Sequence, residues 1–155
     1  MKKQHIVFDT EIIGSSDPVF LVCTKVIETG ITQAFWYHKK GDVVKFNKLL
    51  EDPSYIWISF NGIKFDAPLI AAWINGRPVE TIKMMATKII HQRMQPGESY
   101  RMAGVEGLKF DHIDLIDTAP GVMLSLKTYA GRMNYPTMVD MPFHHDQDLT
   151  AKECK

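Results

Sequence analysis

The sequence predicts an α/β fold in which a mixed five-stranded sheet is flanked by helices. Five segments rich in apolar, β-branched and aromatic residues have the length of strands. Short turns join the first three, as in an antiparallel meander. Segments with apolar residues at helical spacing lie between the third and fourth strands and between the fourth and fifth. This alternation is what identifies the fold class.

Composition favours a single domain over residues 1–155. The chain is 45% hydrophobic and 23% charged, which suits one globular unit with its own core. No apolar run approaches the roughly 18 residues of a membrane span, and no secretory leader is visible, so we expect no membrane partner. Cys23 and Cys154 lack zinc-site spacing and allow at most one disulfide, which favours an intracellular, cytoplasmic protein.

Charge gives no global sign of a nucleic-acid partner. The 18 basic residues balance the 18 acidic ones, so any attraction to a polyanion must come from a local patch. The most basic region lies within residues 83–109, where five Lys and Arg residues outnumber two Glu residues. A solvated face explains this region, and so does a flap on the substrate side.

The first half of the chain predicts three strands and a helix. We expect strands from Ile6 to about Glu11, over residues 19–27 and over residues 31–38, separated by turns at residues 14–17 and at Gly30. Apolar positions at helical spacing predict a helix over residues 43–50, with Asp42 as its N-cap.

The second half predicts two more strands and three helices. Residues 55–58 form the fourth strand, and Asp66 opens a helix that ends before Asn75. A further helix runs from about residue 80 to 94, and residues 97–107 are predicted to be irregular. Residues 110–117 form the fifth strand, and a last helix follows over about residues 124–133.

Two carboxylates stand at the end of the first strand. Asp9 and Glu11 are two residues apart, so their side chains point to the same face with Cα atoms about 7 Å apart. They are close enough to share a hard cation, which would offset the cost of placing two acids together. The alternative is a strand that simply ends, with its two carboxylates in water.

A third carboxylate follows the fourth strand. Asn61-Gly62 is a turn signal, and Asp66 with Pro68 behind it marks the start of a helix. This places Asp66 at the carboxyl end of a strand, where open α/β sheets tend to bind ligands. The alternative is that Asp66 is only an N-cap, worth about 1 kcal/mol.

Together these two stretches resemble the first two motifs of the DEDD superfamily of 3′–5′ exonucleases. Asp9-Thr10-Glu11 matches the Asp-x-Glu motif, and Asn61 with Phe65-Asp66 matches the Asn-x-x-x-Phe-Asp motif. The form of the second motif is most similar to that of family-B and phage-type DNA polymerase proofreading domains. Residues 112–115 and 125–130 resemble a further segment of these domains, in which Asp114 or Asp117 helps to shape the floor of the site. The alternative is that Asp114 is solvated and Asp117 caps a loop.

The resemblance implies a ribonuclease H-like fold and two-metal phosphodiester hydrolysis. Asp9, Glu11 and Asp66 would hold two Mg²⁺ or Mn²⁺ ions, which suit ligation by carboxylates alone. Thr10 would offer backbone contacts to the terminal nucleotide, and Asn61 and Phe65 would line its sugar and base.

The last motif of the superfamily is missing from the sequence. That motif is a fourth carboxylate, placed four residues after a Tyr or five after a His that positions water. His112 and Asp117 have the second spacing, but they lie in or beside a strand, where odd spacing sends side chains to opposite faces. His144 and Asp148 have the Tyr spacing with the wrong residue.

The end of the chain carries a helix-start signal. Thr150 and Glu153 form a capping-box pattern at the point where the last helix of the superfamily would begin. We therefore expect one exonuclease-like domain that lacks its C-terminal helix.

The functional expectation is a metal-dependent 3′–5′ exonuclease-type domain, weak or inactive as this chain alone, for which DNA is favoured as the substrate and RNA stays open. Its partners would be the 3′ end of single-stranded DNA and a polymerase or other replication protein in a bacterial or phage-infected cell. The alternative is a catalytically incompetent module that binds nucleic acid or a partner protein through the same cleft.

Overall fold

A computed structural model describes residues 2–118, 124–136, 146–150 and 153. Its centre is a five-stranded sheet of order β3-β2-β1-β4-β5. The strands are β1 (Gln4–Ile13), β2 (Val19–Val26), β3 (Thr32–Trp36), β4 (Tyr55–Ser59) and β5 (His112–Asp114). The first three pair antiparallel, and β4 and β5 join β1 in parallel. The predicted ribonuclease H-like α/β fold with a mixed five-stranded sheet is confirmed.

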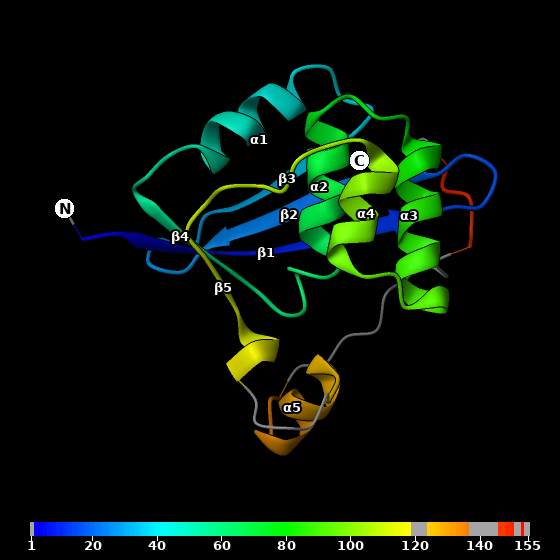
Figure 1. Ribbon diagram of the computed structural model, residues 1–155. Helices are drawn as coiled ribbons and strands as arrows, with labels where there is room; N and C mark the ends of the chain where they lie inside the picture. The colour runs from blue at the N-terminus through cyan, green and yellow to red at the C-terminus, as the bar shows by residue number, and fades with distance from the viewer. Residues whose placement is uncertain (1, 119–123, 137–145, 151–152, 154–155) are drawn as a thin grey trace.

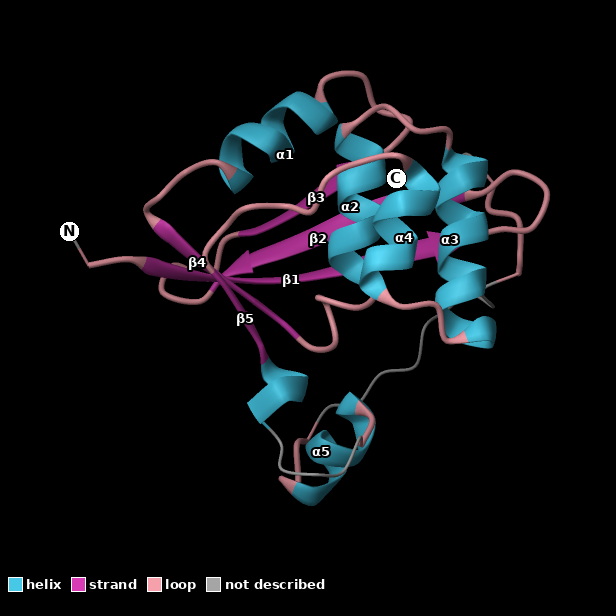
Figure 2. Ribbon diagram, viewed as in Figure 1, coloured by secondary structure: helices cyan, strands magenta, loops and turns pink. Residues whose placement is uncertain are grey.

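Four helices form a layer on one side of this sheet (Figure 1). They are α1 (Asp42–Leu50), α2 (Asp66–Ile74), α3 (Val79–Gln92) and α4 (Pro96–Ala103). A short 3₁₀ helix (Leu115–Thr118) follows β5, and α5 (Leu126–Arg132) lies apart from this layer, beyond the end of β5 (Figure 2). No helix in the described part of the chain combines the length and the apolar character needed to cross a membrane.

The core lies between the sheet and this helical layer. Alternate residues of β1, such as Ile6 and Phe8, are buried against the helices, and the apolar helix α2 is buried along almost its whole length. The other face of the sheet is more open, because Val7 on β1 is 40% exposed and Ile113 on β5 is 44% exposed. Asp9 and Glu11 are on this second face, because they share the alternation of Val7.

Three expectations about secondary structure need correction. Asp42 is the first residue of α1 rather than its N-cap, and its carboxylate instead accepts a hydrogen bond from the N–H of Trp36. Residues 97–107 are not all irregular, because α4 fills most of the segment. The predicted strand over residues 110–117 shortens to β5, since the 3₁₀ helix begins at Leu115.

Candidate active site

The site begins where β4 leaves β1. The two strands pair only from Gln4 to Val7 of β1, although β1 continues to Ile13 along β2. The later residues of β1 therefore have an edge that β4 does not cover. Backbone N–H groups on such an edge need another acceptor. The start of α2 supplies one at Thr10.

Asp66 is the acceptor, and its carboxylate is nearly inaccessible to solvent at 2% exposure. One of its oxygens, Oδ1, accepts hydrogen bonds from both the N–H and the Oγ1 hydroxyl of Thr10, at 2.9 and 2.6 Å. Asp66 is the first residue of α2, and Phe65 is the N-cap. The Asp66 carboxylate therefore connects the start of α2 to the central strand.

Burial leaves Asp66 short of compensation for its charge. Desolvation is the largest cause that raises its pKa, to about 7, and the negative charge of Asp9 raises the pKa further. The hydrogen bonds from Thr10 act in the opposite direction, but they are outweighed. A carboxylate in this state is stabilised by a nearby cation.

Asp9 and Glu11 lie on either side of Thr10 in the chain and on the face opposite to its side chain. Desolvation raises the pKa of Asp9, although the residue as a whole is exposed, because protein atoms surround much of its carboxylate. Desolvation and then the charge of Asp9 raise the pKa of Glu11 to about 7. Burial is the largest cause that raises the pKa of the Cys23 thiol, and the charges of Asp9 and Glu11 raise it further. Cys23 lies on β2, opposite Asp9 on β1. The local field is thus strongly negative.

The carboxylate oxygens of Asp9, Glu11 and Asp66 are the kind of ligand that Mg²⁺ and Mn²⁺ prefer. Asp9 and Glu11 fit a shared cation by position, and Asp66 is coupled electrostatically to Asp9. Within residues 2–118, 124–136, 146–150 and 153, however, no three His, Cys, Asp or Glu side chains are grouped closely enough to hold a metal ion. The structure therefore brings Asp9 and Glu11 together, and it places Asp66 one peptide away without closing a three-ligand group.

The loop before Asp66 is held by Asp114, at the end of β5. Asp114 is 5% exposed, and its carboxylate accepts hydrogen bonds from the N–H groups of Asn61 at 2.7 Å and Ile63 at 2.8 Å. A third, longer bond of 3.2 Å comes from the N–H of Ile116. Asn61 has a φ of 66°, a left-handed conformation that a non-glycine residue rarely adopts unless its surroundings impose it. Asp114 supplies such surroundings.

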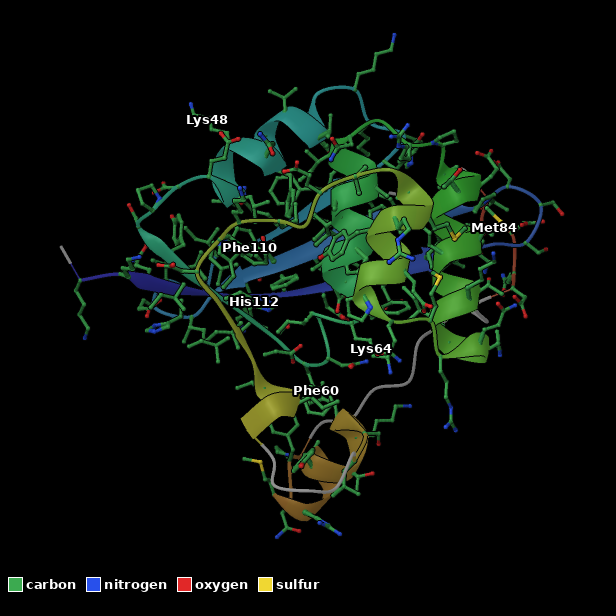
Figure 3. The ribbon with its side chains drawn as sticks, viewed as in Figure 1. Lys48, Phe60, Lys64, Met84, Phe110 and His112 are labelled. Carbon is green, nitrogen blue, oxygen red and sulfur yellow. The ribbon has the colours of Figure 1, made fainter. Side chains whose placement is uncertain are left out.

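Ser59 closes the other side of this loop. Its hydroxyl accepts a hydrogen bond from the N–H of Gly62 and contacts Nε2 of His112 at 2.7 Å. A Cβ at Gly62 would overlap the Ser59 side chain, so only glycine fits there. Figure 3 shows His112 beside Phe110, and their rings stack at 4.8 Å. These contacts fix the path by which the chain turns from β4 into α2.

Three further predicted site residues are Phe65, Asp117 and His144. Phe65 is half-buried against the core, and its N–H bonds to the carbonyl of Asn61, which keeps both residues in the loop that leads to Asp66. Asp117 is in the 3₁₀ helix after β5, where its side chain is outside the described part of the chain, and His144 is outside it altogether.

Asp148 is engaged elsewhere. One oxygen of its carboxylate accepts hydrogen bonds from three consecutive N–H groups, those of Ser15, Ser16 and Asp17. These bonds lower the pKa of Asp148. The residue therefore closes the β1–β2 turn, and the described residues place no partner histidine beside it.

Sequence reasoning missed the roles of Ser59 and His112. Both depend on β5 lying next to β4, a pairing between segments more than fifty residues apart. Gly62 was the available signal for Ser59, because a glycine in this turn allows the Ser59 side chain to lie against it.

No protein-family model matches the sequence, and a search of curated proteins finds no significant match. Among solved structures, the chain is similar to exonuclease I without ligand, with a TM-score of 0.38, 11% identity and 92% of this chain covered. It is also similar to Escherichia coli exonuclease I in complex with a dA16 oligonucleotide, with a TM-score of 0.35, 13% identity and 76% of this chain covered. An inhibitor-bound exonuclease I has a TM-score of 0.38 at 12% identity and 93% coverage. The chain spans about a third of the length of these structures.

Proposed function

We propose that this chain is a metal-dependent 3′–5′ exonuclease-type domain that hydrolyses phosphodiesters at the 3′ end of single-stranded DNA. The observation that carries the proposal is the meeting of Asp66 with Thr10, between Asp9 and Glu11. Asp66 thus contacts the tripeptide that carries Asp9 and Glu11, and the pKa of each of these three acids is raised. Clusters of carboxylates with raised pKa values are common at functional sites.

The residues of the chain would have distinct tasks. Asp9 and Glu11 would hold divalent cations on the open face, and Thr10 would fix the Asp66 carboxylate at the edge of β1. Two bound Mg²⁺ or Mn²⁺ ions would supply an activated water and charge stabilisation for the leaving 3′ oxygen. The 61–65 loop, with Asn61 and Phe65, would border the terminal nucleotide, and Asp114 would keep that loop in place.

The described residues supply no fourth carboxylate and no water-positioning residue beside this cluster. The face that carries Asp9 and Glu11 also exposes Val7 and Ile113, which leaves room for a further segment to pack there. We therefore expect slow hydrolysis by this chain, reduced by about 10²–10⁴-fold relative to a site with its general-base group in place. A polypeptide that packs on this face, such as a polymerase or another replication protein, would supply the missing groups.

The test is digestion of a 5′-labelled single-stranded DNA in Mn²⁺. We expect a slow ladder shortened from the 3′ end, absent in EDTA and absent in the Asp9→Asn variant. Asp111→Asn is the matched control, because Asp111 is an exposed acid beside β5 that pairs with Lys3. A ladder of the same intensity from Asp9→Asn would place the activity elsewhere and overturn the proposal.

A second function is favoured by the incomplete grouping of the three carboxylates. In this alternative the chain is a module that binds nucleic acid through the same cleft and does not cut it. It predicts metal affinity and oligonucleotide binding without any ladder.

A further inference from the structure

A groove between α3 and α4 lies on the basic region noted in the sequence, outside the carboxylate cluster. It has a volume of about 500 Å³. Its lining residues are Lys88, Gln92, Met94, Glu98, Arg101 and Met102.

Two cations and one acid line this groove. Lys88 comes from α3 and Arg101 from α4, and neither has an ion-pair partner among the described residues. Glu98 is the acid of the groove, but one of its carboxylate oxygens accepts the N–H of Gln95 in the capping box of α4. Like charges held on facing helices repel each other unless an anion lies between them. The groove is therefore complementary to negative charge.

The floor of the groove is apolar. Met94 and Met102 are half-buried and pack against the hydrophobic core. Methionine side chains adapt to flat, irregular surfaces, and an unpaired base is such a surface. A duplex keeps its bases stacked inside, whereas a single strand offers phosphates and base faces together. Cations above an apolar floor thus fit a single strand better than a duplex.

The two helices that form the groove, α3 and α4, both contact the helix that begins at Asp66. In Figure 1, α2 begins, α3 ends and α4 begins at the same end of the helical layer. α2 packs against both α3 and α4, and Asp66 is its first residue. Lys64, labelled in Figure 3, precedes it in the loop at this end. A strand whose 3′ end lies beside Asp9 and Glu11 would pass the Asp66 end of the helical layer to reach this groove.

We propose that the α3–α4 groove binds the sugar–phosphate backbone of single-stranded nucleic acid upstream of the 3′ end, with Lys88 and Arg101 on phosphates and a base over Met94 and Met102. This inference rests on the proposed function, because the position of the 3′ end sets the direction of the strand. The groove gives the domain affinity for a strand longer than the terminal nucleotide.

The test measures binding of a 5′-labelled oligothymidylate by fluorescence anisotropy in EDTA, over a range of NaCl concentrations. Each phosphate contact to a single strand contributes about 0.7 to the slope of log K against log salt. The Lys88→Gln/Arg101→Gln variant should therefore lower the slope by about 1.4 and weaken binding roughly tenfold or more near 0.1 M salt. Lys40→Gln/Lys48→Gln is the matched control, since both lysines are exposed and Lys48 is on α1 (Figure 3).

The outcomes separate the groove from the carboxylates. The control should keep the wild-type slope. Because binding is measured in EDTA, where no hydrolysis is expected, the slope tests the groove and not the proposed hydrolysis in Mn²⁺. An unchanged slope in Lys88→Gln/Arg101→Gln, with an unchanged melting temperature, would overturn the inference. So would a poly-glutamate peptide that binds wild type but not this variant while both bind the oligonucleotide equally, because the occupant would then be an acidic protein segment.

Discussion

Asp114 and Asp66 are both buried carboxylates near the ends of neighbouring strands, yet their surroundings differ. Three backbone N–H groups donate to Asp114, all within the loops that follow β4 and β5. Asp66 receives one N–H and one hydroxyl, both from Thr10, and it has the negative charge of Asp9 nearby. The first carboxylate is satisfied by its own fold. The second needs a positive charge that the fold does not supply, and this difference separates a positioning residue from a candidate ligand.

The largest expected effect comes from removing the satisfied carboxylate. Asp114→Ala would leave the part-buried N–H groups of Asn61 and Ile63 without this acceptor and would release the left-handed turn at Asn61. Leaving such groups unpaired costs about 1–3 kcal/mol each, so we expect a loss of about 3–5 kcal/mol in the free energy of unfolding. Urea denaturation measures this loss.

Asp111→Ala is the control for this variant, because Asp111 lies three residues earlier and makes an exposed ion pair with Lys3. Exposed pairs are worth about 1 kcal/mol or less. Equal losses for the two variants would show that Asp114 does not hold the loop.

Removing the charge of an uncompensated carboxylate should have a smaller effect of opposite sign, a gain in the free energy of unfolding. The pKa values of Glu11 and Asp66 rise to about 7 in the folded protein from ordinary values of 4.5 and 3.8. The folded state therefore binds more protons than the unfolded state between these values, and stability falls as the pH rises from about 4 to about 7. In EDTA at pH 8, Asp66→Asn should raise the free energy of unfolding by about 1–2 kcal/mol, because the amide keeps an acceptor for Thr10 without the charge.

Thermal melts across this pH window measure the effect, and Mn²⁺ at pH 8 should raise the melting temperature of wild type more than that of Asp66→Asn. A wild-type melting temperature that rises steadily from pH 4 to pH 8 would contradict the assignment. It would mean that the acids of this cluster are compensated in the same way as Asp114.

Local patterns in the sequence account for much of this comparison. The two-residue spacing placed Asp9 and Glu11 on one face of β1, and the strand-turn-helix pattern placed Asp66 at the end of β4. The contact between Asp66 and Thr10 could not be predicted in the same way. It depends on where β4 parts from β1 and on α2 beginning beside the uncovered edge of β1.

The helix α4 was missed for a different reason. Pro96 and Gly97 were interpreted as the end of the preceding helix, but Pro96 is also suited to the first turn of a new one. Glu98 completes a capping box with Gln95, and Gly104 ends the helix with a φ of 62°. Both signals were local and visible in the sequence. The bonds from the N–H groups of Asn61 and Ile63 to Asp114 were not, because only β4–β5 pairing brings these segments together.

The smallest effect is expected at Asp148, the third carboxylate that collects backbone N–H groups. Its bonds to residues 15–17 are exposed, where water can replace a lost acceptor, so Asp148→Asn should change the melting temperature much less than Asp114→Ala. The same variant tests whether Asp148 is the fourth carboxylate of the site. A general-base or metal-binding residue would cost about 10²-fold or more in Mn²⁺-dependent hydrolysis. We expect the rate to change by less than about threefold, because the carboxylate is occupied by the β1–β2 turn, and a larger loss would show that it leaves this turn to join Asp9 and Glu11.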